Sequence, residues 1–444
     1  MSTTRPPYHS TGLRPDAERP RRWRPDERVD LWLLGPYFGL HEPPVCSLHT
    51  ATVTAAYAEL DTSRPATPFQ CHTPRGLREA VAQCLRWPEL ASPGPAALPD
   101  ELVTERWRAL VRLTEHPLDL DLETRLRLGT LLCALGLDAC ALGVLPASTP
   151  EDAGRDQLSA GLAMKRTHAL VRASGSEAAR AEDREVLTAV ATSRRLPAAT
   201  ALSAALTLVV LNAKGRAPDV AATAHWREVA GAHLAGLAPG GSWRDALFTS
   251  AYWRAVSYLP FLLGDHERTR AELDRAEEHA RDLPDGTEQQ ALVRRQNLHP
   301  LLETRTRAAA AANDLDAALR YAHELAALDP YDGKVLLGLG DVAMRAGDTA
   351  AAVEAYRRAA MLGAPHAARA RVALGRHLEH AGDEEGALDS FLAAAHADPT
   401  AYTAVAAVHR LAERTGRADL ADWCVRWLAD LRARLRVRPE RTVG

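Results

Sequence analysis

Apolar residues recur at helical spacing along most of the chain after residue 100. Trp107, Leu110 and Val111 lie at i, i+3 and i+4, the spacing that places side chains on one face of a helix. We predict about five or six further helices between residues 157 and 283, separated by segments that contain glycine or proline. A short run of alternating residues, 118–122, is expected to lead into a helix. The pattern therefore predicts an all-α fold.

Three glycines recur every seven residues in the apolar segment 126–145, at Gly129, Gly136 and Gly143. Because seven residues are close to two helical turns, we expect the three glycines to lie on one face. A face of small residues lets a neighbouring helix approach closely, so we interpret them as packing positions.

The N-terminal part of the chain lacks this regularity. Residues 1–28 are rich in proline, arginine and serine and bury too little apolar surface to order themselves, so we expect a disordered basic tail. From residue 29 to about residue 90, repeated prolines permit only short helices and extended loops. The predicted domains are the tail (1–28), an irregular and helical region (29–150), helical hairpins (151–285) and repeats with a capping helix (286–438).

A ten-residue segment of the C-terminal third occurs twice. It begins at residue 339 and again at residue 374, a displacement of 35 residues, and both copies start with Leu-Gly and end with Gly-Asp. Each copy is followed by a small residue and an aromatic residue at matching positions, Ala352 and Tyr356 after the first and Ala387 and Phe391 after the second.

Weaker copies continue the same phase on both sides. Asn313-Asp314 precedes the Gly347-Asp348 turn by 34 residues, and Gly416 follows Gly382 by 34 residues. An earlier turn at Gly264-Asp265 has the same order of features and predicts a degenerate hairpin.

The repeated segments resemble the tetratricopeptide repeat, a unit of about 34 residues made of two antiparallel helices. The resemblance covers residues 301–435 and implies a right-handed superhelical solenoid of helical hairpins. In such a hairpin, glycine at the turn takes the left-handed cap conformation, and the small alanines and aromatic residues of the second helix pack against the Leu-Gly pair. The sequence departs from the family pattern because its first helices lack the aromatic residue near their start, and the flanking copies lack Leu-Gly.

The resemblance also implies a concave wall lined by the first helix of each repeat, which would hold a partner. The net-basic composition of this wall predicts an acidic or C-terminal peptide segment as ligand, bound by arginine forks. The alternative is an ordinary solvated helix face. The lysine and asparagine combination of the family's clamp for chaperone tails is not present, so we do not expect a chaperone C-terminus. The predicted wall positions are Arg307, Lys334, Asp341, Arg345, Arg369, Arg376, His380, Arg410 and Arg414.

The composition of the 444-residue chain narrows the function classes further. A formal net charge of -3 provides no bulk field that would attract nucleic acid or an acidic membrane, so we expect neither as a partner. The longest apolar stretch, 198–211, is shorter than the ~20 residues of a membrane span and predicts a buried helix. Six cysteines are too sparse for a disulfide framework and fit a reducing compartment, so we expect a cytoplasmic protein.

One cluster of residues could carry chemistry. Cys46, His49, Cys71 and His72 could ligate zinc, although adjacent Cys71 and His72 are awkward for one tetrahedral site; the alternative is buried thiols and ordinary histidines. We find no phosphate-binding loop, dinucleotide fingerprint, zinc-protease motif or nucleophile elbow, and we expect no cofactor.

The sequence therefore predicts a non-catalytic cytoplasmic scaffold that binds a protein or peptide. Two alternatives stay open: an enzyme or accessory subunit of a biosynthetic complex with a Cys/His site, and the sensory arm of a regulator.

Overall fold

The computed structural model describes residues 48–64, 66, 105–174, 181–214, 217–237, 242–363, 366–398 and 400–436. Every regular element in these ranges is a helix, so the predicted all-α helical-repeat class is confirmed. The chain divides into two compact units that meet in sequence between Pro330 and Tyr331. We call their described parts the N-terminal unit (48–330) and the C-terminal unit (331–436). The predicted basic tail lies outside the described residues, and the domain boundaries proposed from the sequence stay predictions.

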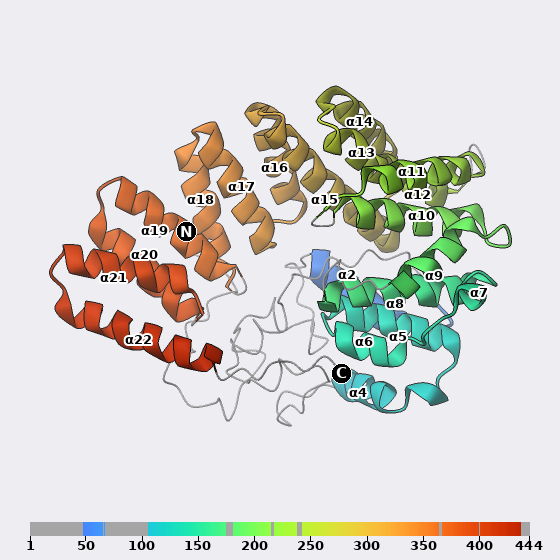
Figure 1. Cartoon of the computed structure of the whole chain (residues 1–444), viewed down its shortest axis with the longest axis horizontal. Helices are drawn as coiled ribbons and strands as arrows, with labels where there is room; N and C mark the ends of the chain where they lie inside the picture. Colours follow the sequence, from blue (N-terminus) through green and yellow to red (C-terminus); the bar gives the residue numbers. More distant parts are fainter. Residues whose placement is uncertain are drawn as a thin grey trace. The chain divides into compact units, whose positions relative to one another are not determined.

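The C-terminal unit is a series of paired helices (Figure 1). Each helix packs against the next one along the chain, and short turns join the two helices of a pair. The pairs are α17 (Gly333–Ala346) with α18 (Thr349–Met361), α19 (Ala367–His380) with α20 (Glu384–Ala397), and α21 (Tyr402–Arg414) with α22 (Ala418–Arg436).

Glycine and aspartate form the turns of this unit, as the repeat predicts. Gly347 and Gly382 have φ values of 81° and 83°, in the left-handed region that side chains disfavour. The carboxylates of Asp348 and Asp383 then accept hydrogen bonds from backbone N–H groups in the first turn of α18 and α20. The matching bends between paired helices are therefore confirmed.

The Leu-Gly glycines make room for the aromatic ring of the following helix. A Cβ atom on Gly340 would lie 2.4 Å from the ring of Tyr356, and one on Gly375 would lie 2.7 Å from the ring of Phe391. Ala352 and the Phe391 side chain are fully buried. The pairing of α17 with α18 and of α19 with α20 thus depends on a glycine in the first helix facing an aromatic residue in the second.

The N-terminal unit contains the remaining described helices. Its bounds are α2 (Leu48–Ala58), α4 (Glu105–Glu115), α5 (Leu122–Ala134), α6 (Asp138–Val144), α7 (Pro150–Ala153), α8 (Gln157–Ser174), α9 (Ala181–Thr192), α10 (Ala198–Ala213), α11 (Val220–Ala235), α12 (Trp243–Val256), α13 (Tyr258–Leu262), α14 (His266–Arg281), α15 (Glu288–Ala311) and α16 (Leu315–Leu328), with a 3-10 turn at Pro117–Asp119.

Helix α10 is the buried helix that the apolar stretch 198–211 predicts. It packs against α9, α11 and α12, and most of its side chains are inaccessible to solvent. The turns predicted before α14 and α16 are also present, because Gly264 and Asn313 have φ values of 75° and 59°. No described helix combines the length and the apolar character needed to cross a membrane.

Helix α2 connects distant parts of the N-terminal unit. The ring of His49 lies 2.8 Å from the carbonyl oxygen of Ala134 at the end of α5. Farther along α2, the amide of Gln296 in α15 donates to the hydroxyl of Thr52 at 2.7 Å. The sequence predicted only short helices and loops in this region, and this helix ties the early hairpins of the unit to the late ones.

The glycine spacing in segment 126–145 was misleading. Gly136 has a φ of 74° and lies in the turn between α5 and α6, so the segment is two helices. A Cβ atom on Gly129 would collide with Leu145 at 2.6 Å, whereas one on Gly143 would meet no atom within 4 Å. The three glycines therefore do not share a face. The alternating run 118–122 does lead into a helix, since Asp121 caps α5.

Candidate functional site

The first helices of the C-terminal unit, α17, α19 and α21, carry most of the predicted wall residues. We call the surface formed by Lys334, Asp341, Arg345, Arg369, Arg376, His380, Arg410 and Arg414 the first-helix face.

Ion pairs connect neighbouring helices across the first-helix face. Arg369 of α19 pairs with Asp341 of α17 at 3.0 Å, and the Tyr356 hydroxyl donates to the same carboxylate at 2.8 Å. Glu379 of α19 pairs with Arg410 and Arg414 of α21 at 2.7 and 3.3 Å. The structure thus brings these predicted residues together, but it also neutralises much of their charge.

Two basic side chains of the first-helix face differ from the others. Arg376 and His380 lie one helical turn apart on α19 and are exposed, and among the described residues neither forms an ion pair. Lys334 and Arg345 are exposed on α17. Arg307, the remaining predicted wall residue, belongs to α15 of the N-terminal unit.

His366, just before α19, is a partly buried residue near this face. A Cβ atom on Gly333 would touch its ring at 3.3 Å. Burial holds the pKa of His366 below its ordinary value; the charge of Asp332 opposes this, and those of Lys334 and Arg369 add to it.

Replacing His366 with glutamine is expected to flatten the pH dependence of the C-terminal unit's stability. Because the pKa is lower in the folded chain, the unfolded chain takes up the proton first as the pH falls. The contribution of the neutral ring is fully present above the ordinary value of about 6.5 and is lost below it. Urea unfolding at about pH 7.5 and about pH 5.5 measures the free energy of unfolding of both proteins, and hydrogen exchange assigns the change to peptides of the C-terminal unit. If the unaltered chain and His366→Gln lose the same free energy of unfolding between the two pH values, the prediction is wrong.

Of the candidate metal ligands of the sequence, only His49 lies among the described residues, so the predicted cluster stays a prediction. The ring of His49 is engaged with the Ala134 carbonyl. Cys46, Cys71 and His72 lie outside the described residues. In the C-terminal unit, burial raises the pKa of the Cys424 thiol to about 11, which suits a packing residue and not a nucleophile.

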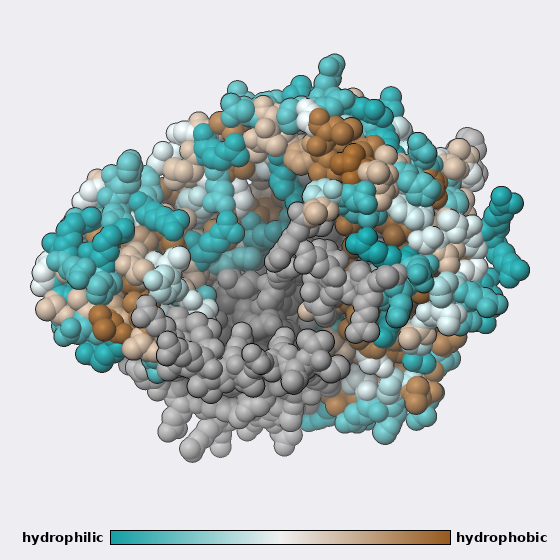
Figure 2. Space-filling view, in the orientation of Figure 1, coloured by the Kyte–Doolittle hydropathy of each residue, from teal (hydrophilic) through white to brown (hydrophobic). Residues whose placement is uncertain are grey.

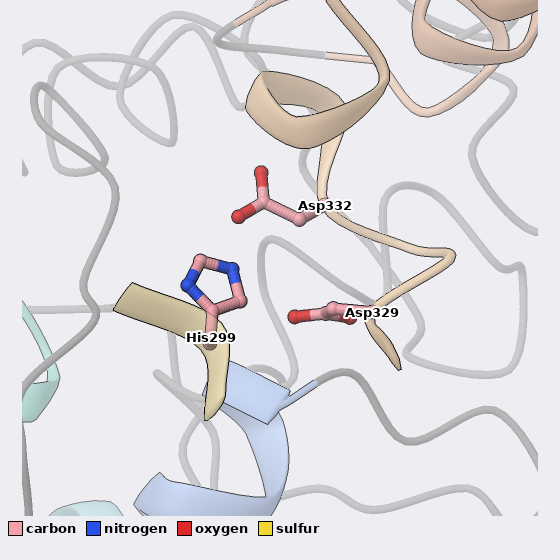
Figure 3. Close-up of side chains that lie close together, drawn as sticks. All are labelled: His299, Asp329 and Asp332. Atoms are coloured by element: carbon pink, nitrogen blue, oxygen red, sulfur yellow. The ribbon is translucent and has the colours of Figure 1, made fainter. Parts of the chain in front are cut away.

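His299 and Asp329 of the N-terminal unit lie close together, with ligand atoms within 4.8 Å (Figure 3). Asp329 is buried and accepts a hydrogen bond from the backbone N–H of Leu48 at 3.3 Å. Asp332, also drawn in Figure 3, belongs to the C-terminal unit and caps α17 through the N–H groups of its first turn. These carboxylates hold helix ends, and we assign them no ligand.

The N-terminal unit contains a cavity of about 640 Å³ between α8, α10 and α12. Its described lining includes the cations Lys165, Arg172, Lys214 and Arg254 and the histidine His168, and it includes no acidic side chain. The sequence analysis missed this site. Its lining residues come from α5, α8, α10 and α12, which are separate segments of the sequence, so no local motif signals it.

The positive charges of this cavity are compensated only in part, by Asp138 at Arg172 and by the charge of Glu303 near Arg254. Arg172 pairs with Asp138 at 3.0 Å, whereas Lys165, Lys214 and Arg254 form no ion pair with any residue that the structure describes. Desolvation by the surrounding protein, and then the positive charges of Lys165 and Arg172, hold the pKa of His168 below its ordinary value.

A group of hydrophobic side chains is visible over α13 (Figure 2). Leu263, directly after this helix, is 64% exposed, and Phe261 and Leu262 are partly exposed. Nothing in the structure shows what would cover them.

Comparison with known proteins supports the repeat. A family model described as tetratricopeptide repeat matches residues 304–364 and 337–402. A search of curated proteins returned no match.

Solved structures show similarity at low identity. The chain is similar to the MamA protein at 15% identity and a TM-score of 0.32, over 44% of this chain and 97% of that one. The chain is also similar to the APC/C hetero-tetramer Cut9-Hcn1, at 15% identity and a TM-score of 0.26, over 73% of this chain and 69% of that one. The similarity to an IFIT1 monomeric mutant with Gppp-AAAA has 12% identity and a TM-score of 0.41, over 90% of this chain and 94% of that one. At these TM-scores the similarities carry no argument about a ligand or partner.

Proposed function

Because the chain is a tetratricopeptide repeat protein, we propose that it is a non-catalytic scaffold that holds a protein partner on the first-helix face of its C-terminal unit. Helical repeats present extended surfaces that bind other proteins. The proposed ligand is an acidic or C-terminal peptide segment, and the proposed location is the cytoplasm, in keeping with the sparse cysteines.

The observation that carries this proposal is the exposed cation Arg376, with the exposed imidazole of His380 one turn away on the central first helix. On either side of them, Asp341–Arg369 and Glu379–Arg410 are ion pairs between neighbouring helices. These pairs occupy Arg369 and Arg410, whereas Arg376 stays available to a carboxylate of the partner. An arginine fork binds a carboxylate through two parallel hydrogen bonds.

Reversing the charge at Arg376 is expected to weaken partner binding at least about tenfold, because the variant places a carboxylate against the acidic ligand. The partner is first identified by cross-linking and mass spectrometry, and the affinity of its acidic segment is then measured by fluorescence polarisation. The free-acid and amidated forms of that segment distinguish recognition of a chain terminus from recognition of acidic side chains.

The matched control is Arg357→Glu, because Arg357 is equally exposed but lies on the second helix α18. It should bind the segment as the unaltered chain does. If Arg376→Glu and Arg357→Glu both bind with unchanged affinity, the partner does not use the first-helix face.

A further inference from the structure

The cavity of the N-terminal unit has two chemically different parts, and their order follows from helix direction. On α10, Leu206 and Val210 precede Lys214 at intervals of four residues, so the three share one face. On α12, Phe248 and Ala251 precede Arg254 at intervals of three residues. In both helices the apolar side chains therefore come first and the cation comes at the C-terminal end.

The two cationic ends lie beside one another. The Lys214 ammonium is 4.9 Å from the ring centre of Tyr258, which follows Arg254 by one turn. The hydroxyl of Tyr258 and the Nε of Arg254 are buried without a hydrogen-bond partner among the described residues. One end of the cavity thus concentrates the positive charges of Lys214 and Arg254, and the charge of Glu303 in α15 offsets that of Arg254 only in part.

The hydroxyl groups of the wall do not offer a further polar site. Ser203 donates to the carbonyl of Ala199 at 2.9 Å, and Thr207 donates to the carbonyl of Ser203 at 2.9 Å. Both therefore bond within their own helix. The described wall between the cations presents mainly carbon atoms, which does not suit a sugar or a nucleobase with many polar groups.

We propose that this cavity binds a small organic anion with an apolar body, such as a medium-chain carboxylate. The carboxylate would lie between Lys214 and Arg254, and the body would lie along Val210, Phe248 and Ala251. The volume of about 640 Å³ lies in the range of small-molecule sites. This ligand site is separate from the first-helix face, so the two proposals succeed or fail independently.

The test is isothermal titration of the full-length chain with decanoate, with decyltrimethylammonium and with inorganic phosphate, each up to about 1 mM. Saturable binding of one decanoate per chain, with no binding of the other two probes, supports the proposal. Failure of decanoate to saturate overturns it. Equal binding of the cationic probe overturns the role of the charges, and equal binding of phosphate overturns the role of the apolar wall.

Three variants locate the binding. Lys214→Gln removes an exposed cation of the cavity and should weaken decanoate binding about tenfold. Ala251→Leu fills the apolar part without changing charge and should weaken binding similarly. Arg194→Gln, which removes an exposed cation outside the lining, should bind as the unaltered chain does. Circular dichroism checks that each variant is folded, and unchanged affinity in both Lys214→Gln and Ala251→Leu would overturn the assignment.

Discussion

Replacement of Phe391 by alanine is expected to lower the free energy of unfolding of the C-terminal unit by about 3–5 kcal/mol. Phe391 is fully buried, and it packs with the core formed by α20, α21 and α22. Truncation removes this buried area and leaves a cavity that the surrounding helices fill only in part. Thermal unfolding combined with hydrogen exchange measures the loss, because exchange assigns it to peptides of α19–α21.

A second substitution tests the geometry behind this expectation. In the unaltered chain, Gly375→Ala should destabilise by about 1–3 kcal/mol because its Cβ atom would lie 2.7 Å from the Phe391 ring. In the Phe391→Ala chain the same methyl group enters vacated space, so its cost should largely disappear. Additive effects of the two changes would show that glycine and ring are not in contact.

The repeat was predictable because its signals are local in sequence. A left-handed turn requires glycine or asparagine at one position, and Gly347 and Asn313 stand there. The space for an aromatic ring requires a glycine in the facing helix, and Gly340 provides it opposite Tyr356. Each requirement involves residues within one hairpin, so a single sequence displays it.

The seven-residue spacing of glycines in segment 126–145 gave a wrong prediction, because spacing alone does not show which glycine a turn requires. Gly129 and Gly143 have the same sequence interval to Gly136, yet only Gly136 adopts a positive φ. The interval carries no information on which glycine ends a helix. Helix α2 was also beyond prediction, since its anchors, the Ala134 carbonyl and Gln296, lie 85 and 244 residues away from the residues that they bind.

The candidate sites were likewise predictable only where the repeat pattern places their residues. The resemblance placed Asp341, Arg369 and Arg410 on neighbouring first helices, and the structure shows ion pairs between those helices. Which of the cations stays unpaired depends on the packing of successive repeats and could not be predicted. The cavity of the N-terminal unit depends on Lys165, Lys214 and Arg254 from three helices, so only the folded chain identifies it.

Replacement of Glu272 by alanine is expected to destabilise the N-terminal unit by about 3–5 kcal/mol, because it leaves the guanidinium of Arg227, whose side chain is 14% exposed, without its counter-ion. Arg227 of α11 donates to Glu272 of α14 at 3.0 Å and to the Val256 carbonyl of α12 at 3.1 Å. The Glu272 side chain is only 6% exposed. Urea unfolding with hydrogen exchange of α11–α14 peptides measures the change.

Two controls separate burial from charge pairing as the cause. Arg270→Ala breaks the exposed pair with Asp314 and should cost about 0–1 kcal/mol, since solvent screens that interaction. The double variant Arg227→Met with Glu272→Leu removes both charges and keeps apolar volume, so it should recover most of the stability lost in Glu272→Ala. If the double variant is as unstable as Glu272→Ala, the loss arises from packing of the side chains and not from the unpaired Arg227 charge.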